Sequence, residues 1–313
     1  NLEEKISEDS ATRLSRTRRV PVGVVGGIVP WNFPVLMAVQ KIVPALLSGC
    51  TMVLKPSPFT PLATLRMAEL IAGVFPPGVL NVITGGDALG PMLTAHPDID
   101  KITFTGSTAT GKRVMESASK DLKRITLELG GNAPFIVFDD ADIDSAVEGA
   151  MASKYRNAGQ TCVCANRLYV QAGVYDTFVA KLAAKASGIK LGNGFEAGVQ
   201  QGPLIDDAAI AKVESHVADA LAKGARVVVG GNKVGDRFYT PTVLADVTGD
   251  MLCAKEETFG PVAPVFKFDT EAEVIKLANA TEFGLASYFY SRDIGRVFRV
   301  GEALEYGMVG VNT

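Results

Sequence analysis

Two cysteines stand in residues 157–164, which read Asn-Ala-Gly-Gln-Thr-Cys-Val-Cys near the middle of the chain. A cysteine at neutral pH is only a few per cent thiolate, from a reference pKa of about 8.5, so a nucleophilic cysteine needs positive surroundings or a helix dipole. Gly159 gives Cys162 a flexible approach, and polar residues flank it. We therefore interpret Cys162 as a nucleophile, with a small buried hydrophobe as the equal alternative when it is taken alone. For Cys50 and Cys253 a structural role is expected.

Cys164 follows Cys162 by two residues. In an extended segment the two side chains would share a face, with Cα atoms about 6.5 Å apart, at the upper limit for a disulfide. Such a bridge would be strained and reducible, so a redox switch is one interpretation of Cys164. A thiol packed behind the nucleophile is the other.

A carboxylate lies upstream in residues 128–132, which read Glu-Leu-Gly-Gly-Asn. The two glycines allow a sharp turn and a close approach, so Glu128 is a candidate general base. The two histidines, His96 and His216, fall in no ligand spacing, and a structural zinc site needs four Cys or His ligands. We expect no metal and interpret both histidines as surface residues.

The composition is that of a soluble globular protein. The 313 residues are 47% hydrophobic and 21% charged, with a net charge of −3, which favours neither nucleic acid nor an anionic membrane as partner. Four cysteines in so long a chain make no disulfide framework, so we expect a reducing compartment, the cytoplasm. The apolar stretch 33–54 is interrupted by Gln40, Lys41 and Pro44 and predicts a buried helix and strand rather than a membrane span.

Strand and helix patterns alternate along the chain, which predicts an α/β fold. We expect a Rossmann-like cofactor-binding domain at residues 21–129 and an α/β catalytic domain at residues 130–313. Residues 1–20 are expected to form a surface helix tail and an oligomerisation strand. Strands are predicted at residues 22–30, 50–54, 78–83, 101–105, 134–138, 167–170, 226–229, 239–244, 262–266 and 308–313.

Residues 106–112 match the spacing of a phosphate-binding loop up to Lys112. The next position should carry a hydroxyl for magnesium, yet it is Arg113, and residues 110–112 have the pattern of a helix interior. The segment therefore argues against a P-loop NTPase, although Gly106 and Ser107 at a helix N-terminus suit a pyrophosphate.

Six motifs together resemble the aldehyde dehydrogenase superfamily in the family's order, and the resemblance covers essentially the whole chain. They are residues 30–34, 55–57, 104–107, 128–132, 159–162 and 256–261. Residues from 154 onward resemble NADP-dependent succinate-semialdehyde dehydrogenases most closely. Residues before Glu128 are more similar to other aldehyde dehydrogenases, so a mosaic of two subfamilies is one interpretation.

The resemblance implies a reaction. Cys162 would attack the aldehyde carbon to give a thiohemiacetal, which passes a hydride to a nicotinamide and becomes a thioester. Glu128 would activate the water that hydrolyses the thioester. The Asn32 amide and the Cys162 N–H would hold the oxyanion.

The resemblance also implies the cofactor contacts. Lys55 and Ser57 would meet the adenosine ribose. Gly106 and Ser107 would meet the pyrophosphate, and Glu257 and Phe259 the nicotinamide ribose and ring. Trp31, Asn32 and Leu129 are further cofactor-binding candidates. Many NAD-dependent relatives have a glutamate three residues after the lysine, where this chain has Pro58. With no carboxylate there and Lys55 as charge partner, we expect NADP to be preferred over NAD.

The substrate implied is a small aldehyde, succinate semialdehyde or another. Arg156 is the candidate for binding a substrate carboxylate. A second arginine of succinate-semialdehyde dehydrogenases is replaced here by Gln40. Each lost charge-assisted hydrogen bond costs ~1.5–3 kcal/mol, so an acid substrate should bind less tightly.

Family members carry further chain at both ends, so the 313 residues are expected to be a fragment of a homodimer or homotetramer. Two alternatives remain open. One is an inactive or weakly active fragment that only binds cofactor or oligomerises. The other is an acylating enzyme that releases the thioester to coenzyme A, which Glu128 as a water base argues against.

Overall fold

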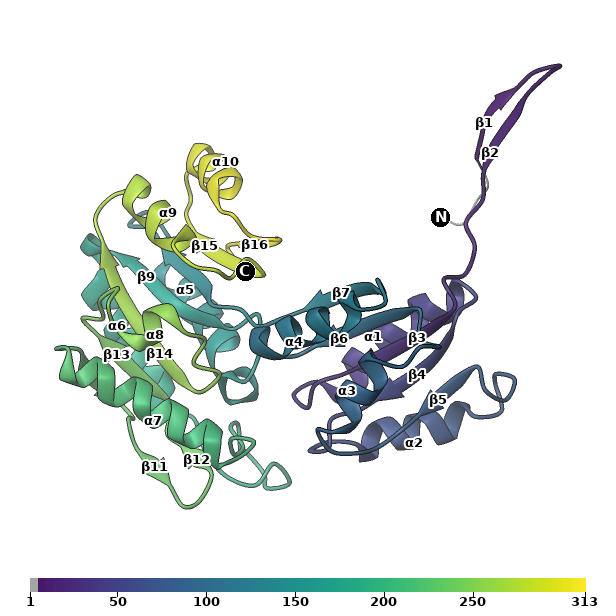
Figure 1. Cartoon of the computed structure of the whole chain (residues 1–313). Helices are drawn as coiled ribbons and strands as arrows, with labels where there is room; N and C mark the ends of the chain where they lie inside the picture. Colours follow the sequence, from purple (N-terminus) through teal and green to yellow (C-terminus); the bar gives the residue numbers. More distant parts are fainter. Residues whose placement is uncertain (1–4) are drawn as a thin grey trace. The chain divides into compact units, whose positions relative to one another are not determined.

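The computed structural model describes residues 5–313. It is organised around two β-sheets of mainly parallel strands, one in each half of the chain. The chain separates into two units, one ending at Leu129 and the other beginning at Gly130 (Figure 1). The predicted α/β class is confirmed, because each unit alternates strands with helices. The boundary predicted from the sequence falls at the same place, and the roles assigned to the two domains remain predictions.

The first unit is built on five parallel strands in the order β5-β4-β3-β6-β7. The chain begins at the central β3, moves outward through β4 and β5, and then returns to β6 on the other side of β3. The winding direction therefore reverses between β3 and β6, the position where open sheets bind ligands. The strands are β3 (Val24–Ile28), β4 (Thr51–Lys55), β5 (Leu80–Val82), β6 (Lys101–Thr105) and β7 (Arg124–Glu128).

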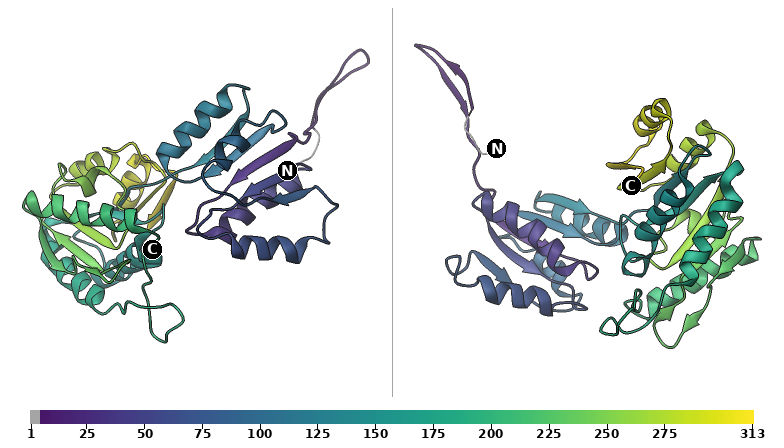
Figure 2. Two further views of the ribbon diagram at one scale, coloured as in Figure 1. Left: turned by 60° about the horizontal axis from the view of Figure 1, so that its bottom comes forward. Right: turned by 180° about the vertical axis from the view of Figure 1, so that it is seen from behind.

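Helices cover both faces of this sheet (Figure 2). Ala38 and Ile42 of α1 pack with Met52 on one face, whereas Leu93 of α3 and Val114 of α4 pack on the other. The helices are α1 (Pro34–Leu47), α2 (Leu62–Ile71), α3 (Leu89–Thr94) and α4 (Thr108–Ser119).

The apolar stretch 33–54 becomes the helix α1 and the strand β4, as predicted. The expectation that this helix is buried is wrong, because one face of α1, with Leu36 and Leu47, is exposed. Within residues 5–313, none of the helices combines the length and the apolar character needed to cross a bilayer. The phosphate-loop spacing at residues 106–112 falls on the start of α4, so residues 110–112 are helical.

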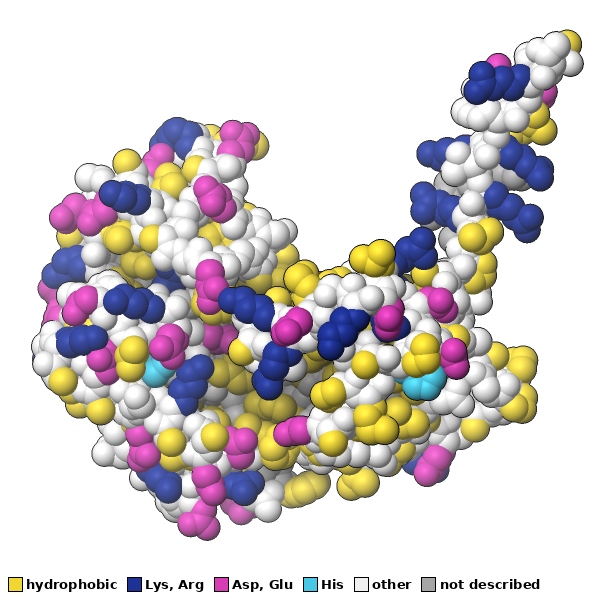
Figure 3. Space-filling view, viewed as in Figure 1, with side chains coloured by type: hydrophobic (Ala, Val, Ile, Leu, Met, Phe, Trp, Pro, Cys, Tyr) yellow, Lys and Arg dark blue, Asp and Glu magenta, His cyan; other side chains and the backbone are white. Residues whose placement is uncertain are grey.

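The predicted helix tail at residues 1–20 is wrong where the structure describes it. Residues 5–17 form the antiparallel pair β1 (Lys5–Asp9) and β2 (Leu14–Thr17) instead, and residues 1–4 lie outside the described part. Basic side chains are prominent along residues 5–19, the exposed pair and the segment that follows it (Figure 3). The role of the pair in oligomerisation remains a prediction.

The second unit is built on seven strands in the order β10-β13-β14-β9-β8-β15-β16. All neighbours are parallel except β10 and β13. The strands are β8 (Ala133–Val137), β9 (Ala165–Gln171), β10 (Arg226–Val229), β13 (Thr242–Ala245), β14 (Val262–Phe268), β15 (Ala286–Tyr290) and β16 (Met308–Val311).

The single strand predicted at residues 239–244 is two strands. β12 (Phe238–Tyr239) pairs with β11 (Lys233–Val234), and β13 begins only after Pro241. A proline has no N–H to continue a ladder, which accounts for the break.

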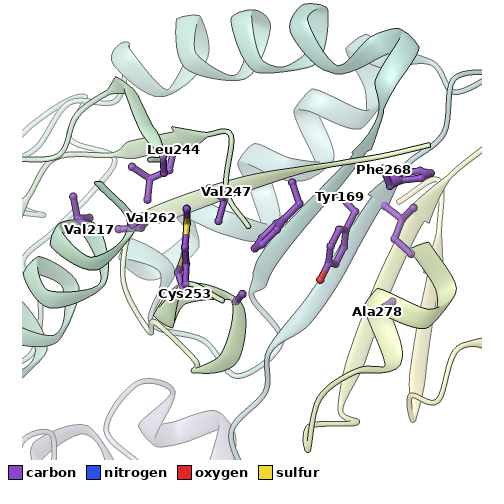
Figure 4. Packing of buried hydrophobic residues seen from close by; sticks show 14 of the residues in the cluster. Tyr169, Val217, Leu244, Val247, Cys253, Val262, Phe268 and Ala278 are labelled. Carbon is purple, nitrogen blue, oxygen red and sulfur yellow. The ribbon is translucent and has the colours of Figure 1, made fainter. Parts of the chain in front are cut away.

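Two helices cover one face of this second sheet, and four cover the other. On one face lie α5 (Ile143–Tyr155) and α6 (Tyr175–Ser187); on the other lie α7 (Asp207–Ala222), α8 (Leu252–Lys255), α9 (Glu271–Asn279) and α10 (Ile294–Ala303). Cys253 packs in the second face's core near Val262 and Leu244 (Figure 4). Both Cys253 and Cys50 are buried, in agreement with their predicted structural role.

Candidate active site

Three loops of the second unit enter neighbouring strands from one edge of its sheet. Residues 130–132 lead into β8, residues 156–164 into β9, and residues 256–261 into β14. The three strands are adjacent in the order β14-β9-β8 and parallel, so they begin at the same edge. The loops that carry the glycine pair, the cysteines and the two glutamates are therefore brought together within this unit.

The cysteine loop leaves α5 through three consecutive residues of positive φ, which are 52° at Asn157, 57° at Ala158 and 72° at Gly159. Such a conformation costs a non-glycine residue roughly 1–2 kcal/mol, and surrounding structure must hold it in place. A Cβ at Gly159 would lie 2.1 Å from the Gly260 carbonyl oxygen. Only glycine fits where these two loops touch.

Cys162 lies in a turn that is held by its own backbone, by Tyr288 of β15 and by the glycine pair. The Cys164 N–H donates to the Thr161 carbonyl at 3.2 Å, and the Tyr288 hydroxyl donates to the Val163 carbonyl at 2.8 Å. A Cβ at Gly131 would lie 2.2 Å from the Cys162 carbonyl oxygen, so the turn rests directly on the glycine pair. The Cys162 side chain is half-buried.

The extended geometry expected between Cys162 and Cys164 is wrong, because the chain turns there. Cys164 is completely buried, and its Sγ donates to the Lys154 carbonyl at 3.6 Å. This burial favours the interpretation of Cys164 as a thiol packed behind the nucleophile. The redox role of Cys164 remains a prediction.

Glu257 folds back over the glycine pair. Its Oε1 accepts a hydrogen bond from the Gly131 N–H at 2.9 Å, and a Cβ at Gly130 would lie 2.5 Å from Oε2. Burial raises the pKa of this carboxyl to about 7, while the hydrogen bond from Gly131 and the ammonium groups of Lys212 and Lys154 act in the opposite direction. Glu257 can therefore change its protonation near neutral pH.

A buried ammonium group lies beneath the same loops. Lys154 is fully buried, and its Nζ donates to Asn166 Oδ1 at 2.9 Å. The Asn166 Nδ2 in turn donates to the Gly131 carbonyl at 3.4 Å. Sequence reasoning missed Lys154, although a lysine in the last turn of a helix that leads to a nucleophile is a usable signal.

His216 is buried, not a surface residue as expected. Its Nδ1 lies 3.1 Å from Thr258 Oγ1 and its Nε2 lies 3.4 Å from Glu256 Oε2. The ring thus contacts both residues that flank Glu257. Across residues 5–313, no three or more His, Cys, Asp or Glu side chains are grouped so as to hold a metal ion.

A pocket of about 230 Å³ in the second unit adjoins the cysteine turn. It is lined by Arg156, Thr161, Val163 and Tyr288, among others. Thr161 and Val163 are the immediate neighbours of Cys162. The predicted carboxylate-binding arginine therefore lines a pocket next to the candidate nucleophile.

In the first unit the predicted residues lie at the carboxyl edge of the sheet. Asn32 follows β3, Lys55 ends β4, Ser107 follows β6 and Glu128 ends β7. Ser107 caps α4, because its hydroxyl accepts a hydrogen bond from the Thr110 N–H at 3.3 Å. The edge thus offers the N-terminus of a helix, which is suited to an anion.

A larger pocket of about 340 Å³ lies in the first unit, in the size range of small-molecule sites, about 300–1,000 Å³. Ile28 and Phe104 contribute apolar wall, and Lys55, Asp87 and Arg113 contribute charge. Pro58 leaves the third position after Lys55 without a carboxylate, but Asp87 brings one to this pocket from another loop.

The remaining predicted positions of the first unit are less enclosed or serve packing. Pro58 and Gln40 are exposed, Trp31 is half-buried and Ser57 is buried. Leu129 packs against α4, where a Cβ at Gly111 would lie 2.5 Å from its Cδ2.

Lys41, which follows Gln40 on α1, is a buried cation that was not predicted as a site residue. Its Nζ donates to Thr103 Oγ1 at 3.2 Å. Burial lowers its pKa to about 8, and the Glu128 carboxylate partly opposes that shift.

The model of the aldehyde dehydrogenase family matches residues 1–313. The chain belongs to the aldehyde dehydrogenase family. The chain is 58% identical to a 3-sulfolactaldehyde dehydrogenase of Pseudomonas putida, over 99% of the chain and 65% of the relative. It is 61% identical to a succinate-semialdehyde dehydrogenase [NADP(+)] of Escherichia coli (strain K12), over 94% of the chain and 62% of the relative.

A solved structure described as an E. coli NADP dependent enzyme superposes with a TM-score of 0.97 at 57% identity, over 100% of this chain and 66% of the other. The Rossmann-like and catalytic α/β architecture is thereby confirmed. The chain spans less than two thirds of the curated relatives it matches, 65% and 62% of their lengths.

Within each unit the structure brings the predicted residues together, whereas their chemical roles remain predictions. Arg156, Cys162, Glu257 and Phe259 lie on the joined loops of the second unit. Gly106, together with Asn32, Lys55, Ser107 and Glu128, lies at one sheet edge of the first.

Proposed function

We propose that the protein to which this chain belongs oxidises a small aldehyde to the carboxylate with NADP or NAD. The proposal rests on family membership and on the chemistry that each unit's residues offer. Bound NADP or NAD supplies a nicotinamide that accepts the hydride.

The Cys162 thiolate attacks the aldehyde carbon, so a carbon–sulfur bond forms and the carbonyl oxygen becomes an oxyanion. The Asn32 amide and the Cys162 N–H stabilise that oxyanion. Loss of the hydride converts the thiohemiacetal into a thioester. Glu128 takes a proton from water, the resulting hydroxide adds to the thioester, and cleavage of the carbon–sulfur bond releases the carboxylate and returns the thiolate.

Supporting features of the first unit fit a dinucleotide. A helix N-terminus capped by Ser107 suits the pyrophosphate, and the pocket of about 340 Å³ has apolar walls for a flat base.

We propose a substrate with an anionic group at the end opposite the aldehyde. The exposed Arg156 lines the pocket beside the cysteine turn and can bind a carboxylate in a bidentate manner. The names of the two relatives describe aldehydes of this class, one sulfonated and one carboxylated. Succinate semialdehyde is therefore the first substrate to test.

The observation that carries the proposal is the different placement of the two thiols. Cys162 is half-buried at a turn that adjoins a pocket, whereas Cys164 is completely enclosed. A nucleophile must reach a substrate, and of these two thiols only Cys162 meets that requirement.

The test is the absorbance of reduced nicotinamide at 340 nm with succinate semialdehyde, or with propanal, which has no carboxylate. We expect Cys162→Ser to lower turnover by at least about a thousandfold, because a hydroxyl is a far weaker nucleophile at neutral pH. The matched control Cys164→Ser should retain most of the activity. Equal losses in the two variants would overturn the assignment of the nucleophile.

Arg156→Gln tests the substrate class. It should raise KM for succinate semialdehyde about tenfold or more and leave propanal nearly unchanged, because only the acid loses a charge-assisted hydrogen bond. An equal effect on both aldehydes would contradict an anionic substrate bound by Arg156.

A further inference from the structure

Three charged side chains line the pocket of about 340 Å³, and each comes from a different segment of the first unit. Lys55 ends β4, Asp87 lies in the loop before α3, and Arg113 lies in the second turn of α4. Two positive charges and one negative charge therefore share a rim whose inner walls are apolar. The wall suits a flat base, and the rim suits the sugar and phosphate attached to it.

Asp87 supplies an acceptor to this rim. An ionised carboxylate only accepts hydrogen bonds, so it matches the free hydroxyls of a ribose. A phosphate on the ribose 2′ oxygen removes that hydroxyl's proton and adds negative charge next to the carboxylate. Asp87 therefore favours an unmodified ribose.

Arg113 supplies donors to the same rim. Its guanidinium has five N–H donors. One of them, on Nη2, donates a hydrogen bond to Thr110 Oγ1 at 3.3 Å. Thr110 also lines the pocket, so this contact directs the guanidinium along the pocket wall. The planar fork of an arginine matches a phosphate bidentately, and Arg113 therefore favours a 2′-phosphate.

We propose that Asp87 and Arg113 are opposed specificity residues, so that Asp87 selects the free ribose of NAD and Arg113 selects the 2′-phosphate of NADP. This inference rests on the proposed function, because it takes the pocket to be the site of the adenosine half of the cofactor. Lys55, which is buried, serves both ligands. The pocket therefore accepts either cofactor, and Asp87 and Arg113 together set the ratio of the affinities for NADP and NAD.

The experiment measures binding of adenosine 5′-monophosphate and adenosine 2′,5′-bisphosphate by calorimetry. These ligands differ only in the 2′-phosphate, and neither undergoes chemistry. Asp87→Asn should raise the preference for the bisphosphate about five- to tenfold, and Arg113→Gln should lower it by a similar factor.

Two exposed residues of α4 that do not line the pocket serve as matched controls. Glu116→Gln changes the net charge as Asp87→Asn does, and Lys112→Gln changes it as Arg113→Gln does. We expect each control to alter the preference for the bisphosphate less than about twofold. Thermal unfolding of all four variants establishes that they are folded.

The outcomes separate the two levels of the proposal. If the unmodified chain binds neither nucleotide, the nucleotide site itself is wrong and the inference falls with it. If it binds both, but Asp87→Asn and Arg113→Gln leave the preference unchanged or shift it in the same direction, the opposed roles are wrong and the proposed function stands.

Discussion

The predicted site residues of the two units lie at different edges of their mainly parallel sheets, the carboxyl edge in the first unit and the amino edge in the second. In the first unit the predicted cofactor residues follow the carboxyl ends of β3, β4 and β6. In the second unit the cysteine, glycine and glutamate loops precede the amino ends of β9, β8 and β14. The same kind of sheet therefore presents two chemically different edges.

The edge at which the predicted residues lie determines whether positive potential comes from helix N-termini or from side chains. Helices that follow strands present their N-termini at the carboxyl edge, so α4 offers partial positive charge and free N–H groups there. Helices that precede strands present their C-termini at the amino edge, where α5 ends just before the cysteine loop. That end is partially negative, so a thiolate needs cations from side chains, and Lys154 and Arg156 stand at this end of α5.

Each unit also holds an ionisable group whose pKa burial moves close to neutrality. In the first unit it is a base, Lys41, with a pKa of about 8. In the second it is an acid, Glu257, with a pKa of about 7. Such groups gather at functional sites more often than elsewhere, and their opposite signs predict opposite responses to pH.

The largest effect is expected from the second unit's loop junction. Gly159→Ala forces a Cβ to within 2.1 Å of the Gly260 carbonyl at a backbone φ of 72°. We expect a loss of about 2–4 kcal/mol in unfolding free energy, because a backbone group cannot move aside as a flexible side chain can. Chemical denaturation followed by circular dichroism measures the change.

The control for this prediction is Gly173→Ala. A Cβ at Gly173 would meet open space, with no atom of the described residues within 4 Å, so we expect this substitution to change stability by less than about 0.5 kcal/mol. If the two substitutions were equally costly, close packing of the two loops would not be what holds the cysteine turn.

Much of the sheet architecture could be predicted from local pattern. β6 has the bounds predicted for it, residues 101–105, because a buried run bounded by turn residues needs no distant information. β7 was missed because it is an edge strand with only alternate residues half-buried, and it follows a charged turn. The helices α8, α9 and α10 and the strand β15 were also not predicted.

The site was predicted where motifs are contiguous and was missed where contacts join distant segments. Asp87 reaches the pocket of Lys55 although 32 positions separate them in the chain. The turn at Cys162 depends on left-handed residues that contacts with other loops hold in place, and no local rule indicates them. His216 could have been found, because it shares the helical spacing of the buried Val213, Val217 and Ala220.

The next largest effect tests the acid of the second unit. The pKa of Glu257 is raised in the folded state, so its contribution to stability is present below its unfolded pKa and is lost as pH rises through about 7. Glu257→Gln removes this dependence. We expect the variant to gain on the order of 1–2 kcal/mol relative to the unmodified chain between pH 5 and pH 8, measured by denaturation at both. A difference that does not vary with pH would contradict a buried, titrating carboxyl.

Lys41→Met tests the base of the first unit. The pKa of Lys41 is lowered in the folded state, so its contribution is present above the unfolded value of 10.5 and is lost as pH falls through about 8. The unmodified chain should therefore gain relative to the variant, by about 1 kcal/mol, when pH rises from 8 to 10. Denaturation midpoints at the two pH values measure it, and Lys112→Met, which changes an exposed lysine, should show no such dependence.

The smallest expected effect on stability is that of His216. This residue contacts the loop that carries Glu257, so its titration is linked to that loop. Burial lowers the pKa of His216, and Lys212 adds to this, while Glu256 and Asp219 oppose it. The neutral ring is therefore favoured in the folded state, so stability is lost as pH falls below about 6.5, the value expected when unfolded. His216→Gln should weaken this acid dependence by roughly 0.5–1 kcal/mol.

The same variant separates a positioning role from simple packing. Gln can replace only part of the contacts to Thr258 and Glu256, so the residues on either side of Glu257 become less fixed. Under the proposed function, KM for the cofactor should then rise more than kcat falls, because the nicotinamide ribose is held by this loop and the aldehyde is not. His96→Gln, at an exposed histidine of the first unit, is the control and should change neither parameter. If the changes in kcat and KM of the His216 variant were explained by its lower stability alone, the ring would only pack against the loop and would not position Glu257.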